Sequence, residues 1–167
     1  MTDLDSADID GLVRSDKVHR RVFTDPDLFE LEMERIFGRV WVYVGHDSQV
    51  SAAGDWLRSR IGTHQVVVTR HDDGRIHVLR NRCAHRGMAV CKAERGNARR
   101  LVCPYHGWAF HHDGALAGVP HASGYAKGIR PGDPAYALDR VPRVDSYRGF
   151  VFASMAPDGP GLAEYLG

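Results

Sequence analysis

The sequence predicts an all-β domain, a sandwich or barrel, preceded by one short helix. From Val40 onward, short runs of β-branched and aromatic residues recur, and turn residues separate them. Many short strands at close spacing are typical of sandwiches and barrels. The chain has 167 residues and is 43% hydrophobic, which is enough for one globular domain with its own core.

The helix is expected close to the N-terminus. Residues 1–20 carry scattered acidic side chains without periodicity, so we expect a mobile arm there. Thr24-Asp25-Pro26 predicts a helix start, because a capping side chain precedes proline at the first helical position. Apolar residues then recur at helical spacing, at Phe29, Met33, Ile36 and Phe37. Gly38 is expected to end the helix.

The strands are expected in seven segments, namely Val40–Val44, Trp56–Ile61, Gln65–Arg70, Arg75–Leu79, Arg99–Val102, Trp108–Phe110 and Phe150–Ala153. Turns are expected at Asp72-Asp73-Gly74, Gly96-Asn97 and Asp113-Gly114. Residues 117–135 are rich in Gly, Pro, Ala and Ser, and predict a long irregular connection. The sequence has no internal repeat and no glycine-rich phosphate loop.

Composition excludes several classes of function. The formal net charge is +1, which gives no general attraction to nucleic acid or membranes. No apolar run is long enough to span a bilayer, and the acidic N-terminus has no apolar segment typical of a secretory signal. We therefore expect a cytoplasmic protein that binds neither nucleic acid nor membrane. In such a protein, three cysteines favour metal binding or plain burial over a disulfide framework.

Two short segments carry the chemistry. Cys83-Ala-His85-Arg86-Gly87 and Cys103-Pro-Tyr105-His106-Gly107-Trp108 each offer one thiolate and one imidazole, followed promptly by glycine. A single residue between cysteine and histidine is too short for both to chelate one ion in an ordinary zinc turn. Two neighbouring metals suit this spacing, one bound by the sulfurs and the other by the ring nitrogens. This is the ligand set of a Rieske [2Fe–2S] cluster, held by Cys83, His85, Cys103 and His106.

The same segments carry a resemblance to a known family. NRCAHRGM and CPYHGWAF resemble the Rieske domain in the α subunit of bacterial aromatic ring-hydroxylating oxygenases. FTDPDLFELEMERIFGRVWVYVGH and the GDW near residue 54 resemble the helix and first strand that open those subunits. The similarity covers roughly residues 20–155. It implies an all-β Rieske fold, with a sandwich or barrel base and a small cluster-binding subdomain at about residues 80–118.

Departures from other Rieske proteins narrow the subtype. Respiratory-chain Rieske proteins have an extra cysteine in each loop, where this chain has Met88 and Tyr105, and a serine where it has Trp108. Fewer hydrogen-bond donors to sulfur imply a reduction potential toward the low end of the range, roughly −150 to +300 mV, known for such clusters. The oxygenase type is therefore favoured. Around the ligands, we expect supporting contacts from Arg86, Gly87, Tyr105, Gly107 and Trp108, with the indole shielding the cluster from water.

The resemblance also implies components that this chain does not contain. In ring-hydroxylating oxygenases a second domain follows, with a mononuclear Fe(II) on two histidines and a carboxylate. His106 and His111 do not supply a second iron site, because His106 is a cluster ligand. We expect a piece of a longer oxidoreductase: residues 1–38 form the arm and helix, 39–156 the Rieske domain, and 157–167 the start of a linker to an absent catalytic domain. Its expected function is electron transfer from an NADH-dependent reductase or ferredoxin to the catalytic iron of a neighbouring subunit. The family forms trimers, in some members with β subunits, and acts in aromatic compound catabolism.

Alternatives remain for the function and for several residues. The four ligands could instead bind a structural zinc ion in an interaction module, and the chain could be a stand-alone Rieske ferredoxin. Cys91 is interpreted as a buried free cysteine. Residues 80–100 hold seven basic side chains against Glu94 alone, and form either a docking rim for an acidic donor or a surface neutralised by another domain or subunit. His111, His112 and His121 are expected to be solvated. His19, His46, His64, His71 and His77 show no ligand spacing.

Overall fold

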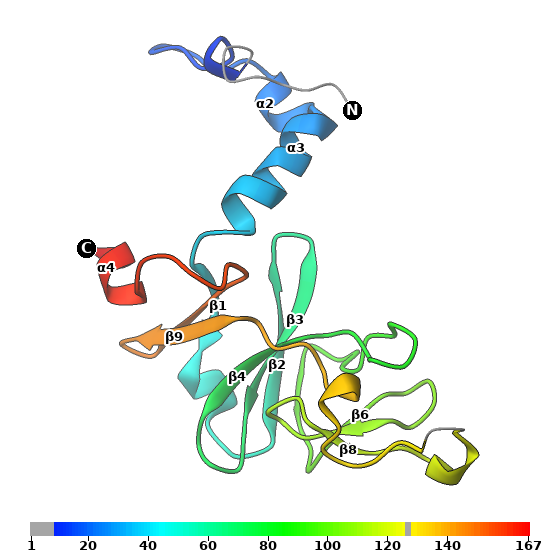
Figure 1. The fold of residues 1–167 in the computed structure, drawn as a ribbon. Coiled ribbons are helices and arrows are strands. Elements are labelled where there is room, and N and C mark those ends of the chain that lie inside the picture. The colour runs from blue at the N-terminus through cyan, green and yellow to red at the C-terminus, as the bar shows by residue number, and fades with distance from the viewer. Residues whose placement is uncertain (1–8, 126–127) are drawn as a thin grey trace.

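The computed structural model describes residues 9–125 and 128–167, which form three antiparallel sheets and several short helices (Figure 1). The first sheet has the order β1-β10-β9 and consists of β1 (Val42–His46), β9 (Arg143–Tyr147) and β10 (Phe150–Ser154). The second has the order β4-β3-β2-β5 and consists of β2 (Asp55–Ile61), β3 (His64–Arg70), β4 (Ile76–Arg80) and β5 (Arg95–Asn97). The third has the order β6-β7-β8 and consists of β6 (Leu101–Val102), β7 (Ala109–Phe110) and β8 (Leu116–Gly118). The predicted all-β class is confirmed.

Three strands escaped the sequence prediction, namely β5, β8 and β9. The expected turn at Gly96-Asn97 is wrong, because both residues belong to β5 and pair with β2. Gly96 lies opposite Trp56, and a Cβ atom on Gly96 would come within 2.7 Å of Cζ2 of that indole. This glycine therefore makes room for a ring that lies across the strand, and it does not reverse the chain.

The predicted N-terminal helix is present as α3 (Pro26–Glu32), which begins where expected, and a last π-helical turn, η1 (Met33–Phe37). A short helix that the sequence did not predict, α2 (Arg21–Thr24), precedes it. Asp25 caps α3 by accepting hydrogen bonds from the backbone N–H groups of Asp27 and Leu28, at 3.0 and 3.4 Å. Gly38 follows the last turn. Asp25-Pro26 thus sets the start of α3, as the sequence predicts.

The described part of the N-terminal arm is more regular than expected. Val13 and Val18 form an antiparallel bridge, and His19 N–H donates to the Leu12 carbonyl at 2.7 Å. Leu12 is buried. Residues 9–20 therefore contain local pairing that the sequence did not predict, while residues 1–8 lie outside the described residues.

The helical arm extends away from the sheets (Figure 1), and much of its apolar surface is exposed. Phe23 is 79% exposed, Phe29 46% and Ile36 47%. In α3 only Leu28 is classed as buried. The predicted apolar face exists, but the described residues of this chain leave much of it open to solvent.

Short helices occupy the connections. They are η2 (Asp47–Val50), η3 (Ala122–Gly124), η4 (Pro134–Tyr136) and α4 (Leu162–Leu166). The expected irregular connection at 117–135 contains the end of β8 and two of these 3-10 turns, and is otherwise without regular structure where it is described. None of the helices in residues 9–125 and 128–167 has the length and hydropathy needed to cross a bilayer.

Two hydrophobic cores share the neighbouring strands β3 and β4. Val66 and Val68 of β3 pack into one core with residues of β1 and β10. Val67, between them, packs into the other core together with Leu79 of β4 and residues of β6, β7 and β8. Successive side chains of a strand point to opposite faces, so both faces of this sheet are covered. The second core also contains Cys83, Cys103 and Trp108, and thereby joins the two cysteine–histidine loops to the base.

Candidate iron–sulfur site

The two cysteine–histidine loops have the same backbone hydrogen bonds. Cys83 N–H donates to the Met88 carbonyl at 2.8 Å, and Gly87 N–H donates to the Cys83 carbonyl at 2.8 Å. In the second loop, Cys103 N–H donates to the Trp108 carbonyl at 2.8 Å, and Gly107 N–H to the Cys103 carbonyl at 3.0 Å. Each loop is therefore a six-residue turn that begins at its cysteine.

Glycine is required at the fifth position of both turns. Gly87 has φ +72° and Gly107 has φ +70°, which is the left-handed region that other residues enter only with strain. A Cβ atom on Gly107 would also lie 3.0 Å from Cγ of Pro120. Both glycines therefore allow a tight turn of the backbone that another residue could form only with strain.

The thiols and the imidazoles form two separate pairs. Cys83 and Cys103 are 3% and 2% exposed, and their thiol groups are within hydrogen-bonding distance of each other. The rings of His85 and His106 lie with centroids 4.7 Å apart, the first partly buried and the second exposed. Soft sulfur donors thus gather on the core side and nitrogen donors at the surface.

Burial and neighbouring dipoles set the protonation of these groups in the metal-free chain. Burial raises the pKa of the Cys83 thiol to about 11, against the opposing effect of the His85 N–H, which hydrogen-bonds to its sulfur. Burial also lowers the pKa of His85, and the nearby His106 and Arg86 act in the same direction. The His85 ring is therefore neutral at neutral pH and has a lone pair for a metal, whereas the thiol must lose its proton when a metal binds.

The aromatic residues predicted to support the loops stack on the imidazoles. The indole of Trp108 is 2% exposed and parallel to the His85 ring, with centroids 4.9 Å apart. Tyr105 stacks on His106 at 3.7 Å, and the guanidinium of Arg86 lies 5.8 Å from the Tyr105 ring. These contacts fix the orientation of both rings and cover part of their faces.

Sequence reasoning missed the residues that hold Trp108 in place. Tyr125 Oη accepts a hydrogen bond from Trp108 Nε1 at 3.3 Å, and the Tyr136 ring packs edge-on at 5.8 Å. Tyr125 belongs to the connection at 117–135, and Tyr136 follows that connection directly. No motif or spacing in the sequence marks either residue.

Asn81 is a second residue that the sequence did not reveal. Its side chain is buried, and its Oδ1 accepts from the backbone N–H groups of Val90 and Cys91, both at 2.9 Å. Its Nδ2 donates to the Cys91 carbonyl at 2.8 Å. Asn81, two residues before the first loop, thus ties the segment that precedes the loop to the segment that follows it. Cys91 is 5% exposed, as predicted for a buried free cysteine, and burial raises the pKa of its thiol to about 12.

The comparison with protein families decides the identity of this fold. Residues 40–144 match the family model of the Rieske [2Fe-2S] domain. The chain belongs to the Rieske [2Fe–2S] domain family. The expected Rieske fold is thereby confirmed, and a [2Fe–2S] cluster is the cofactor of this domain.

Relatives of this Rieske domain include α subunits of a demethylase and of dioxygenases. The chain is 44% identical over 146 residues to the N,N-dimethyl phenylurea N-demethylase subunit alpha of Sphingobium sp. (strain YBL2), a match covering 87% of this chain and 32% of the relative. It is 42% identical over 165 residues to the biphenyl 2,3-dioxygenase subunit alpha of Rhodococcus jostii (strain RHA1), covering 96% and 35%. The chain therefore spans about a third of the length of the curated relatives it matches.

Solved structures give the same assignment. Naphthalene 1,2-dioxygenase from Rhodococcus sp. bound to indole has a TM-score of 0.83 to this chain at 39% sequence identity, and the match covers 92% of this chain and 35% of that one. A quaternary ammonium Rieske monooxygenase in complex with an inhibitor has a TM-score of 0.78 at 28% identity, covering 88% and 40%. The resemblance to α subunits of ring-hydroxylating oxygenases is confirmed.

The donor set of the Rieske loops fits a two-metal cluster better than one zinc ion. Among the described residues, only His71, Asp73 and His77 bring three potential ligand atoms within 4.8 Å of one another. The four loop residues do not, because the sulfur pair and the nitrogen pair lie apart. A cluster in which cysteines bind one iron and histidines the other requires this separation.

The predicted basic surface borders the first loop. Of the seven basic residues, Arg80 and Arg100 are partly buried and the others are exposed, namely Arg82, Arg86, Lys92, Arg95 and Arg99. A concave pocket of about 410 Å³ is lined by Arg80, Arg82, Gly87 and neighbouring residues. Arg80 Nη2 lies 2.8 Å from Nδ1 of His64, whose pKa is lowered by burial and by this guanidinium.

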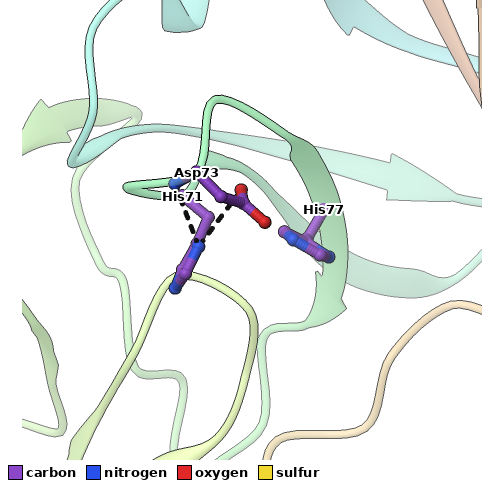
Figure 2. Close-up of side chains that lie close together, drawn as sticks. All are labelled: His71, Asp73 and His77. Atoms are coloured by element: carbon purple, nitrogen blue, oxygen red, sulfur yellow. Dashed lines mark hydrogen bonds and ion pairs between the residues drawn. The ribbon is translucent and has the colours of Figure 1, made fainter.

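The structure corrects the interpretation of two groups of histidines. His112 was expected to be solvated but is 2% exposed, and its carbonyl accepts a hydrogen bond from Thr69 Oγ1 at 2.5 Å. His71 and His77 were expected to lack ligand geometry but lie close together beside Asp73 (Figure 2). His71 and His77 are six residues apart in sequence, and the pairing of β3 with β4 brings them to the same end of the hairpin. A spacing along the chain does not reveal this proximity. His121 is exposed, as expected.

Proposed function

We propose that this chain is the electron-entry domain of an aromatic ring-hydroxylating oxygenase, with Cys83, His85, Cys103 and His106 as the ligands of its [2Fe–2S] cluster. The observation that carries the proposal is the pair of equivalent turns, which gathers two buried thiols and, separately, two imidazoles at the surface. When bound, the cluster supplies reversible one-electron transfer.

Each protein group has a defined role in this proposal. The thiolates anchor the cluster to the core, and the backbone N–H groups of His85 and Arg86 donate hydrogen bonds to the Cys83 sulfur. The stacked Trp108 and Tyr105 hold the imidazoles in one orientation. His106 is exposed, so a redox partner can approach its ring closely, and we propose the imidazole side as the route by which electrons leave.

The ligand assignment is tested by metal and sulfide analysis of anaerobically purified protein. We expect red-brown protein whose visible absorption bleaches on dithionite, with a low-average-g EPR signal in the reduced state and acid-labile sulfide equal to iron. Cys83→Ser and Cys103→Ser should lose colour and sulfide. Cys91→Ser is the matched control, because Cys91 is equally buried but lies outside the two turns, and it should keep both. Colourless protein containing one zinc per chain would instead support the interaction-module alternative.

We also propose a role for the exposed basic residues as a docking rim for an acidic donor, an NADH-dependent reductase or a ferredoxin. Arg82 directly precedes Cys83, Arg86 lies within the first loop, and both side chains are exposed. Opposite charges raise encounter rates, and salt screens them. The rate of cluster reduction by the donor should therefore fall with added salt, and Arg82→Gln should reduce this salt dependence. A rate that does not change with salt would favour the alternative, a surface neutralised by another domain or subunit.

Electron delivery to a catalytic iron outside this chain completes the proposal. The exposed apolar face of the N-terminal helix supports a larger assembly, since Phe29 and Ile36 are the kind of residues that another domain or subunit covers. We propose that electrons pass to a mononuclear Fe(II) in the catalytic domain of a neighbouring subunit of a trimer, in the cytoplasm, for hydroxylation of an aromatic ring. The test is the full-length protein with its reductase: NADH-dependent hydroxylation should disappear in His106→Ala while the Fe(II) site remains loaded.

A further inference from the structure

The turn between β3 and β4 gathers two imidazoles and a carboxylate far from the cluster loops. The strands are in register with Arg70 opposite Ile76 and Thr69 opposite His77. The pairing continues past β3, because His71 N–H donates to the Arg75 carbonyl at 2.9 Å. His71 and His77 therefore lie at the same end of the hairpin, at the end of β4 opposite the first cluster loop.

The three side chains face one another, as Figure 2 shows. Asp73 lies between the histidines, with its Oδ1 3.2 Å from Nδ1 of His71. The two rings are nearly perpendicular, with centroids 5.9 Å apart. One potential ligand atom from each residue lies within 4.8 Å of the other two.

These groups have donor atoms to spare. Nε2 of His77 is buried and has no hydrogen-bond partner among the described residues. Burial lowers the pKa of His77, so its ring is neutral and keeps a lone pair at neutral pH. The Arg75 N–H donates to Oδ1 of Asp73, and this bond lowers the pKa of that carboxyl. Oδ2 lies 3.8 Å from Nε of the exposed Arg75 guanidinium.

The turn between β7 and β8 has the same hydrogen bonds as the turn between β3 and β4, but among the described residues its carboxylate completes no group of three potential ligand atoms. A turn of this kind therefore forms without such a group of three side chains. In the turn between β7 and β8, His111 N–H donates to the Ala115 carbonyl at 2.8 Å, and Ala115 N–H donates to Asp113 Oδ1 at 3.0 Å. There the carboxylate pairs with the guanidinium of Arg140 at 2.8 Å. Among the described residues, Asp73 has no guanidinium at that distance, and it faces two imidazoles instead.

We propose that His71, Asp73 and His77 bind a divalent transition-metal ion, and that zinc is the ion that they suit best. Two imidazoles and one carboxylate, with water in the fourth position, are a known zinc donor set. Ligand atoms around tetrahedral zinc lie roughly 3.3 Å apart, so the three donors must move inward by about an ångström. Asp73 is on an exposed turn and can make this movement. The ion would link β4 to the turn and stabilise the hairpin.

The test is zinc binding to the chain with its cluster intact, so that the cysteine–histidine loops are already filled. Calorimetric titration with Zn²⁺, followed by dialysis and elemental analysis, should give one zinc per chain in addition to the iron. Zinc should also raise the thermal unfolding midpoint, because it binds only the folded hairpin. Asp73→Asn and His71→Ala lie at the surface and should fold normally. Each should weaken zinc binding by at least about tenfold, since loss of even a group that supports a ligand costs roughly 10–100-fold.

The matched control is His46→Ala. His46 Nδ1 and Asp47 Oδ1 form a pair at the same 3.2 Å, but among residues 9–125 and 128–167 no third potential ligand completes a site with them. This variant should bind zinc as the parent chain does. Absence of saturable binding would overturn the proposal, and so would binding that Asp73→Asn and His71→Ala leave unchanged. Neither outcome affects the cluster assignment, because iron and sulfide are measured in the same samples.

Discussion

Replacing Asn81 with alanine should destabilise the domain strongly, although it removes only one buried polar side chain. The substitution removes three hydrogen bonds, two accepted from the N–H groups of Val90 and Cys91 and one donated to the Cys91 carbonyl. Asn81 is 5% exposed, so water cannot replace these bonds easily. At roughly 1 kcal/mol for each bond, the cost in free energy of unfolding is about 3 kcal/mol. A domain of this size loses roughly 2–4 °C in its midpoint per kcal/mol, so the expected decrease is about 6–12 °C.

The assay compares apparent thermal midpoints of cluster-loaded protein at one fixed scan rate, with the visible absorption recorded in parallel. Asn97→Ala is the matched control. Asn97 also uses its amide to bond across the chain, to the Ala53 carbonyl at 3.1 Å and to Asp55 Oδ1 at 2.8 Å, but it is exposed. Its loss should cost about 0.5 kcal/mol or less. Equal midpoints for the two variants would refute the claim that buried pairing of Asn81 holds the first loop closed.

Three further predictions concern the second loop and its surroundings. Gly107→Ala must adopt a left-handed backbone at a cost of about 1–2 kcal/mol and should lower cluster content, whereas Gly118→Ala, with open space around it, should not; equal iron-to-protein ratios would contradict this. Tyr125→Phe should lose about 1 kcal/mol of stability, and Trp108→Phe should lose more, because the smaller ring also leaves a gap in the core; in a double-mutant cycle by denaturant unfolding, the double variant should lose about 1 kcal/mol less than the sum of the two, and full additivity would mean that their hydrogen bond contributes nothing. Burial lowers the pKa of His112, so below about pH 6.5 the unfolded chain binds more protons than the folded chain, and the free energy of unfolding falls as the pH decreases. In His112→Gln this decrease between about pH 7 and pH 5 should be smaller. An unchanged dependence of the free energy of unfolding on pH would be evidence against the prediction.

The features that the sequence predicted well are those that depend on neighbours in the chain. Asp25 and Pro26 specify a helix start through their own side chains, and Gly87 and Gly107 specify turns through their own backbone freedom. The two cysteine–histidine turns belong to the same class, because each is closed by backbone hydrogen bonds within six residues of the chain.

The features that were missed depend on residues that are distant in sequence. Gly96-Asn97 looks like a turn in the sequence, but Gly96 lies in strand β5, where it is opposite Trp56 of β2 and makes room for the indole ring. Asn81 is a single buried polar residue and forms no pattern. His71 and His77 become neighbours only when β3 pairs with β4. Side chains brought together by strand pairing cannot be recognised from a spacing along the chain.

The double-sided burial of β3 limits how this molecule can be shortened or transplanted. Removing the cluster loops and the small sheet β6-β7-β8 would expose Val67 and Leu79 to solvent. Val66 and Val68, on the opposite face of the sheet, would stay buried. Conversely, the loops grafted alone onto a foreign scaffold would lose the apolar floor on which Cys83 and Cys103 rest. Engineers who want a minimal electron carrier from this chain must therefore keep both halves, since neither is a separable module.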